Sequence, residues 1–264
     1  MKFSPLNVPL HRRMETVGAL CWFLFTPPFA FVFFCGAFFL ACLIPVVGLP
    51  LAIGYSIWAC FVDDTPSKGG RPIEFFKNLG IWHHFAAFFP AKLVKTADLD
   101  PQGNYLFCYH PHGILSVGAF LAFGTNALGF SELFPGIGMR IMTLKMNFTM
   151  PFYREYLMAY GAAEVSYKSC IRNLTAGPGR SITIVIGGAS EALEAHPNTM
   201  RLTLEKRKGF VRVAMDSGAS LVPVLCFGEN DLYDSVDNPE GSRIRTFQNR
   251  MLKMMGYSSP VFHG

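Results

Sequence analysis

Charged residues are scarce in this chain, and one long stretch near its N-terminus has none. Asp, Glu, Lys and Arg make up 16% of the 264 residues, whereas 51% of the residues are hydrophobic. Residues 16–62, a run of 47, contain no Asp, Glu, Lys, Arg or His, which is too apolar for an ordinary cytosolic enzyme. A membrane-crossing helix needs about 20 apolar residues, so two fit in this stretch.

Paired cysteine motifs and clustered metal ligands are also absent from the sequence. The seven cysteines are odd in number and show no CxxC spacing, which argues against a disulfide framework or a zinc ribbon. We expect them to be small buried hydrophobes in a reducing compartment. The net charge of +5 suits an anionic membrane surface or a phosphorylated substrate, and it is no signature of nucleic-acid binding.

Prolines divide the apolar stretch and predict a helical hairpin embedded in the membrane. Pro27 and Pro28 would kink a first limb over residues 17–44, a turn would follow at residues 45–50, and residues 51–62 would return. Two full spans and a hairpin that enters one leaflet both fit these lengths. A signal peptide fits poorly, because its apolar core would be only about 7–15 residues long.

The distribution of polar residues predicts three regions: residues 1–62 with the hairpin, residues 63–99 with a linker and an aromatic helix, and an α/β domain over residues 100–264. Basic residues flank the hairpin on both sides, so the positive-inside tendency places both ends and the α/β domain in the cytosol. The aromatic helix suits the headgroup layer of a membrane, and a core helix of the globular domain fits almost equally well. In both cases Phe88-Phe89-Pro90 should end it, since proline disfavours α geometry in the preceding residue.

Strands alternate with helices beyond residue 104. Such alternation predicts an α/β layer domain with a mostly parallel sheet, in which sites gather at the carboxyl ends of strands. The predicted strands cover residues 105–109, 181–186 and 221–227, and the predicted helices cover residues 113–123, 154–160 and 209–216.

Two histidines lie at the end of the first predicted strand, in the run His110-Pro111-His112-Gly113. Pro111 lacks an N–H group and has a fixed φ, so the backbone must form a shaped corner here. Histidine exchanges protons near neutral pH, which favours a proton-transfer site, although histidines bonded to backbone at a strand end are about as common. Glu191 follows the strand over residues 181–186 and is the candidate acidic partner.

Three chemistries could use these groups. Metal-dependent hydrolysis is disfavoured, because no cluster of His, Asp or Glu has ligand spacing. A serine hydrolase could use Ser190 in Gly-Ala-Ser-Glu-Ala, but the last glycine of the nucleophile elbow is missing, and only His263 follows as a base. Acyl transfer from a thioester to a hydroxyl needs a histidine base, an acid and a positive site, and the basic run over residues 205–212 offers the last of these.

The histidine corner resembles the HPHG signature of the type 2 diacylglycerol acyltransferases and the related monoacylglycerol and wax-alcohol acyltransferases. The resemblance extends along almost the whole chain. Further blocks similar to the family are Phe88-Phe89-Pro90, Leu133-Phe134-Pro135-Gly136, Arg154-Glu155-Tyr156-Leu157-Met158, Gly187-Gly188-Ala189-Ser190-Glu191, Arg207-Lys208-Gly209-Phe210-Val211, Leu221-Val222-Pro223 and Phe227-Gly228-Glu229-Asn230-Asp231.

This resemblance implies an enzyme of the endoplasmic reticulum membrane and of lipid droplets, with its catalytic domain facing the cytosol. The implied reaction transfers an acyl group from acyl-CoA, a co-substrate, to diacylglycerol to form triacylglycerol, without a metal or other cofactor. Monoacylglycerol and long-chain alcohols are the alternative acceptors. Membrane lipids are implied partners, nucleic acid is not, and homo-oligomerisation stays open.

The resemblance also suggests roles for individual residues. The His-x-x-x-x-Asp pair of the broader glycerolipid acyltransferases is absent, since Leu115 stands at the aspartate position. We expect His112 to be the base and Glu191 to orient its imidazole, while His110 shapes the corner and binds substrate. The expected substrate-binding residues are Pro111, Gly113, Phe88, Phe89, Pro90, Arg207, Lys208, Gly209 and Asn230.

The C-terminus departs from the family pattern. The chain stops at Val261-Phe262-His263-Gly264, inside a block that the family continues as HGRG and follows with a further region. The sequence therefore looks truncated, which leaves room for a non-enzymatic alternative in which an inactive protein sits on membranes or lipid droplets.

Overall fold

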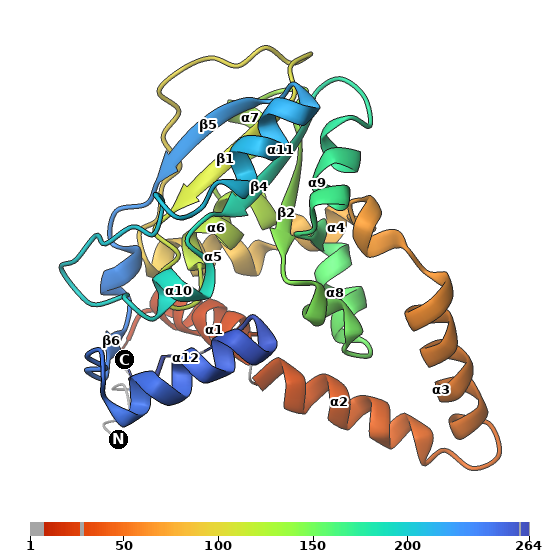
Figure 1. Cartoon of the computed structure of the whole chain (residues 1–264). Helices are drawn as coiled ribbons and strands as arrows, with labels where there is room; N and C mark the ends of the chain where they lie inside the picture. The colour runs from red at the N-terminus through yellow and green to blue at the C-terminus, as the bar shows by residue number, and fades with distance from the viewer. Residues whose placement is uncertain (1–7, 27–28, 259, 264) are drawn as a thin grey trace.

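A computed structural model describes residues 8–26, 29–258 and 260–263, so Pro27, Pro28 and Gly264 lie outside the described residues. Its centre is a five-stranded sheet in the order β3-β2-β4-β1-β5, in which every pair of neighbours is parallel (Figure 1). This confirms the predicted α/β domain with a mostly parallel sheet. The strands are β1 (Tyr105–His110), β2 (Gly138–Thr143), β3 (Ala162–Glu164), β4 (Arg180–Val185) and β5 (Ser220–Leu225), and a separate antiparallel pair is formed by β6 (Asp234–Ser235) and β7 (Phe262–His263).

Helices cover both faces of the sheet. Side chains of β1 alternate between the two faces, as the pleat of a strand requires. Tyr105, Phe107 and Tyr109 pack with α6, η3 and α7, whereas Leu106 and Cys108 pack with α9 and α11. The helical segments are α1 (Leu10–Leu24), α2 (Phe29–Cys42), α3 (Gly48–Ile57), η1 (Trp58–Val62), η2 (Thr65–Lys68), α4 (Glu74–Lys77), α5 (Gly80–Phe88), α6 (Val117–Ala119), η3 (Phe120–Gly124), α7 (Phe130–Leu133), η4 (Lys145–Thr149), α8 (Tyr153–Ala159), α9 (Tyr167–Leu174), α10 (Gly188–Ala192), α11 (Gly209–Ser217), η5 (Glu229–Asp231) and α12 (Arg243–Met255).

The uncharged stretch folds into helices that are separated by breaks. α1 packs on α5, whereas α2 and α3 extend away from the sheet (Figure 1). Within the described residues no single helix has the length and hydropathy of a membrane span, and α1 with α2 reaches them only as a pair bent by 68°. The membrane hairpin therefore stays a prediction, and the large apolar side chains exposed on α2 and α3 are compatible with it.

The aromatic helix α5 is a core helix on one of its faces. Trp82 and Phe85 are buried, and they pack with Trp22 of α1 and Phe120 of η3. Each such aromatic pair adds about 0.5–1.5 kcal/mol beyond the area that it buries. α5 ends at Phe88, as the sequence predicts, and the contacts of its buried face favour the core alternative for this helix.

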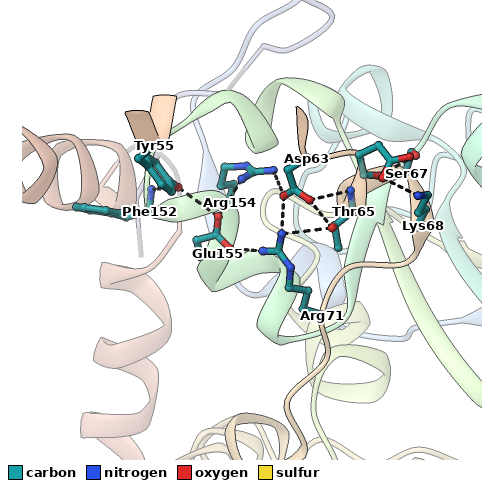
Figure 2. A network of polar contacts seen from close by, with 10 residues as sticks. Tyr55, Asp63, Thr65, Ser67, Lys68, Arg71, Phe152, Arg154 and Glu155 are labelled. Carbon is teal, nitrogen blue, oxygen red and sulfur yellow. Dashed lines mark hydrogen bonds and ion pairs between the residues drawn. The ribbon is translucent and has the colours of Figure 1, made fainter. Parts of the chain in front are cut away.

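A polar network ties the end of the apolar stretch to α8 (Figure 2). The Oδ2 atom of Asp63 accepts hydrogen bonds of 2.6 Å from both Arg71 and Arg154. Arg71 also donates to Glu155 at 2.7 Å, and the hydroxyl of Tyr55 on α3 donates to the same carboxylate at 3.2 Å. Burial opposes ionisation of Asp63, but hydrogen bonds from Thr65, Arg154 and Arg71 outweigh it and lower the pKa to about 2. Asp63 and Arg154 are both buried, and removing either partner of a buried ion pair costs about 3–5 kcal/mol.

Candidate active site

The histidine corner lies at the carboxyl end of β1, which pairs with β4 on one side and with the edge strand β5 on the other. The His110–Pro111 peptide bond is cis, and both Gly113 (φ 58°) and Ser116 (φ 55°) are left-handed. The left-handed backbone at Gly113 and Ser116 interrupts helical geometry, and α6 begins only at Val117. The expectation of a helix from residue 113 is therefore wrong for its first four residues, which form a loop instead.

Glu191 on α10 lies beside this corner and is 2% exposed. Its Oε2 atom accepts a hydrogen bond of 2.7 Å from the backbone N–H of His112 and lies 3.5 Å from Nδ1 of His110. Its Oε1 atom accepts one of 2.7 Å from the N–H of Thr203. The structure thus brings together the three predicted catalytic residues. It also corrects one detail, since Glu191 faces the ring of His110 and meets His112 at the backbone.

The environment of Glu191 favours its ionised form. Burial raises the pKa of this carboxyl, but the His110 ring and the amides of Thr203 and His112 outweigh burial and lower the pKa below its ordinary value. Glu191 is therefore a fixed negative charge at neutral pH that faces an imidazole.

His112 is held in one tautomer by its own turn. Its Nδ1 atom lies 2.9 Å from the carbonyl oxygen of Gly113. A carbonyl oxygen can only accept, so Nδ1 carries the proton and Nε2 keeps its lone pair. Burial lowers the pKa of His112, since desolvation of the imidazolium outweighs the Gly113 carbonyl and the charge of Glu191. The side chain is therefore a neutral imidazole with a basic Nε2 atom.

His110 differs from His112 in its surroundings. It is 5% exposed, its Nδ1 atom faces the Glu191 carboxylate at 3.5 Å, and its Nε2 atom has no hydrogen-bond partner among the described residues. A buried polar group without a partner costs free energy that a ligand could recover on binding. His110 therefore fits a role in shaping the corner and contacting substrate.

The predicted phosphate-binding residues lie together at the end of the loop that leads from α10 to α11. Arg207 donates hydrogen bonds of 3.0 Å to the carbonyl oxygen of Gly187 and to Oγ of Ser190, beside the helix that carries Glu191. Lys208 is exposed and precedes α11, whose first residue is Gly209. The positive charge of Arg207 thus lies beside α10.

Asn230 holds the same loop from another side. It is 6% exposed, and its Nδ2 atom donates to the carbonyl oxygen of Thr199 at 2.8 Å. Its Oδ1 atom is buried and has no hydrogen-bond partner within the described ranges. Asn230 and Glu191 therefore fix the loop at two points, Thr199 and Thr203.

Of the three predicted substrate-binding residues at the end of α5, one packs near the histidine corner and two are exposed. Phe89 packs in the cluster that contains Leu115 and Val117, directly after the histidine corner, whereas Phe88 and Pro90 are exposed. Ser190 accepts its hydrogen bond from Arg207, which cannot act as a base at neutral pH, so the geometry gives no support to a serine nucleophile.

Sequence reasoning did not single out Glu229, although its carboxylate lies at the same corner. Its Oε1 atom accepts from the N–H of Val117 at 2.8 Å. Its Oε2 atom accepts from the N–H of Gly118 at 2.9 Å and from the hydroxyl of Tyr109 at 2.7 Å. The signal was present, because Glu229 closely follows β5, which pairs with β1, and the ends of parallel neighbours converge.

Comparisons with known proteins cover nearly the whole chain. The model of a family described as "Diacylglycerol acyltransferase" matches residues 41–264. The chain is 48% identical to diacylglycerol O-acyltransferase 2A of Umbelopsis ramanniana over 264 residues, which is 100% of this chain and 73% of that protein. It is 43% identical to diacylglycerol O-acyltransferase 2 of Dictyostelium discoideum and 45% identical to 2-acylglycerol O-acyltransferase 1 of Homo sapiens, in each case over 100% of this chain and 78% of the relative. No solved structure matches it.

Proposed function

Because the chain belongs to the diacylglycerol acyltransferase family, we propose that it transfers a fatty acyl group from acyl-CoA to the free hydroxyl of diacylglycerol, forming triacylglycerol. Monoacylglycerol is the alternative acceptor, since one relative is named for 2-acylglycerol, and a long-chain alcohol would react by the same chemistry. No further cofactor enters the proposal.

The observation that carries the proposal is the state of His112. Its Nδ1 proton is held by the carbonyl oxygen of Gly113, 2.9 Å away, which leaves Nε2 as a neutral base. A positioned histidine base contributes about 10²–10⁴-fold to a proton-transfer step.

The reaction then proceeds without a covalent intermediate on the enzyme. Nε2 of His112 takes the proton of the acceptor hydroxyl as its oxygen attacks the thioester carbonyl carbon. The new C–O ester bond forms, the C–S bond breaks, and the sulfur of CoA leaves as a thiolate that takes the proton from the imidazolium. Glu191 supports this cycle by holding the backbone of His112 and by facing His110, which would contact the reacting groups.

The remaining predicted residues have binding roles in this proposal. Arg207, Lys208 and the start of α11 at Gly209 would bind phosphates of CoA, because cations and helix N-termini both favour anions. Phe88, Phe89 and Pro90 would border the lipid acceptor, and the free Oδ1 atom of Asn230 would accept a hydrogen bond from substrate.

A membrane location follows from the nature of the acceptor. Diacylglycerol resides in a bilayer, and the exposed apolar side chains of α2 and α3 would bring the site to it. We propose attachment to the endoplasmic reticulum membrane with the sheet domain in the cytosol, and access to lipid droplets.

The test is an acyl-transfer assay with membranes from cells that lack their own triacylglycerol synthesis and express this chain. Labelled oleoyl-CoA is supplied with diacylglycerol, monoacylglycerol or a fatty alcohol, and the products are resolved. We expect labelled triacylglycerol, and His112→Ala should lower its formation by at least about a hundredfold. His83→Ala, at an exposed position on α5, is the matched control and should leave the rate unchanged.

Several outcomes would contradict the proposal. Absence of product with all three acceptors, from folded protein in the membrane, would favour a non-enzymatic role. Normal transfer by His112→Ala together with complete loss in His110→Ala would move the base to the other histidine. Thioester hydrolysis that disappears in Ser190→Ala would establish the serine hydrolase instead.

A further inference from the structure

Glu229 is buried, at 3% exposure, and its carboxylate binds both ends of the loop that carries the two histidines. Tyr109, whose hydroxyl donates to it, immediately precedes this loop. Val117 and Gly118, whose N–H groups donate to it, immediately follow the loop. One side chain thus clamps the loop over residues 110–116 at its base.

The clamp also fills the inside of the loop. A Cβ atom added to Gly113 would lie 2.6 Å from Cγ of Glu229, and one added to Gly118 would lie 2.8 Å from its Oε2 atom. Real Cβ atoms do not approach other heavy atoms so closely. The glycine that ends the His-Pro-His-Gly run is therefore needed for the packing of Glu229 as well as for its own left-handed backbone.

We propose that Glu229 is a positioning residue for acyl transfer, which fixes the histidine loop so that Nε2 of His112 faces the acceptor hydroxyl. This inference rests on the proposed function. Glu229 is not proposed as a catalytic residue, because its two oxygen atoms already accept hydrogen bonds from Val117, Gly118 and Tyr109.

A carboxylate suits this position better than any neutral side chain. The two backbone amides point at different oxygen atoms, so both oxygen atoms must accept. A glutamine has one accepting oxygen, and its NH₂ group would face an N–H donor. An aspartate keeps both acceptors but is one methylene shorter, so it could not reach both ends of the loop unless the backbone moved.

The experiment compares Glu229→Gln with the unaltered chain in the acyl-transfer assay. Each rate is divided by the amount of protein that stays monodisperse in detergent, which serves as the measure of folded protein. We expect kcat to fall by about tenfold or more, with the KM values for oleoyl-CoA and diacylglycerol changed by less than about twofold, because the loop moves relative to substrates that still bind. The acidic limb of the kcat–pH profile should also shift, because a displaced loop changes the environment of the His112 imidazole and therefore its pKa. Glu132→Gln, an exposed carboxylate on α7, is the matched control.

A purely structural role predicts a different pattern. The yield of folded protein would fall, while kcat per folded protein and the pH profile would match those of the unaltered chain, and this result would overturn the inference. A higher KM with unchanged kcat would overturn it as well, since it would place Glu229 in substrate binding.

Two further results keep the inference separate from the proposed function. If Glu229→Gln does not fold, Tyr109→Phe replaces it in the assay, because it removes one of the three close donors to Glu229. Tyr109→Phe should lower kcat by about threefold with unchanged KM values. An unchanged kcat would then overturn the inference. An unaltered chain that is inactive defeats the proposed function itself, and His112→Ala that is active defeats the role of His112 as the base. An active chain, an inactive His112→Ala and a fully active Glu229→Gln defeat only the role of Glu229.

Discussion

Two buried glutamates flank the histidine corner, and their pKa values shift in opposite directions although both accept backbone hydrogen bonds. Glu191 accepts from the amides of His112 and Thr203, and Glu229 accepts from those of Val117 and Gly118. The pKa of Glu191 is lowered, whereas burial raises the pKa of Glu229 despite its hydrogen bonds from Tyr109, Gly118 and Val117.

The difference lies in the third partner of each carboxylate. Glu191 faces the imidazole of His110 at 3.5 Å, a group that can carry positive charge, whereas Glu229 faces the hydroxyl of Tyr109 and the thiol of Cys226. At Glu229 the neutral donors do not offset burial, whereas at Glu191 the imidazole of His110 acts together with two amides and outweighs it. Glu191 therefore places its charge opposite an imidazole, whereas Glu229 holds the shape of the loop through its hydrogen bonds and packing.

The largest effect should come from removing the charge of Glu191. Glu191→Gln keeps the volume but replaces one accepting oxygen with an NH₂ group, so either His112 or Thr203 loses its acceptor, and His110 loses its anionic partner. We expect kcat for acyl transfer to fall by about a hundredfold or more, against about tenfold for Glu229→Gln. Equal losses in the two variants would show that the two carboxylates do not differ in role.

The second effect concerns shape. Gly113→Ala places a methyl group 2.6 Å from Cγ of Glu229 at a φ of 58°, and it should lower the free energy of unfolding by about 2–4 kcal/mol, from overpacking and backbone strain together. In a Glu229→Ala background the same change should cost about 1–3 kcal/mol less, because the overpacking disappears. Thermal unfolding in detergent measures both.

Gly218→Ala is the control for backbone strain alone. Gly218 has a φ of 70°, and a Cβ atom there would meet nothing within 4 Å. Gly218→Ala should lower the free energy of unfolding by about 1–2 kcal/mol, both in the unaltered chain and in Glu229→Ala. If Gly113→Ala costs the same with and without the Glu229 side chain, the clamp does not fill the loop.

The smallest effect is on the pH dependence of stability. The lowered pKa of Glu191 adds stability above its unfolded value of about 4.5, which is lost as the pH falls through the folded value. The raised pKa of Glu229 adds stability below about 4.5, which is lost as the pH rises through its folded value. Unfolding free energies measured from pH 3.5 to 8 should therefore show less loss in acid for Glu191→Gln and a gentler decline with rising pH for Glu229→Gln. The opposite signs would contradict the assignment.

Much of the sheet could be predicted from the sequence, because three of its strands are runs of apolar and β-branched residues. The predicted strands at residues 105–109, 181–186 and 221–227 correspond to β1, β4 and β5, which lie next to one another. β2 and β3 were missed, since β2 includes Gly138 and Arg140 and β3 has only three residues. α12 was missed because arginines interrupt its apolar positions.

The candidate site was predictable in its members and less so in its geometry. The rule that strand ends converge correctly brought His110, His112 and Glu191 together. That Glu191 contacts the backbone of His112 could not be predicted, because backbone amides leave no mark in a residue pattern. The same holds for Glu229, whose partners include the amides of Val117 and Gly118.

The network around Asp63 has a consequence for exchanging parts between related proteins. Asp63 lies just after the apolar helices, while Arg71 and Arg154, which both bind it, lie in the linker and in α8, far apart along the chain. The segment over residues 10–62, which contains the apolar helices, is therefore not independent of the sheet domain. A chimera with residues 1–62 from a relative keeps Asp63 and both arginines, but the new apolar helices must lead into Asp63 in the same direction for these ion pairs to form. A chimera with residues 1–63 from a relative must have an acidic residue at position 63, because Arg71 and Arg154 remain.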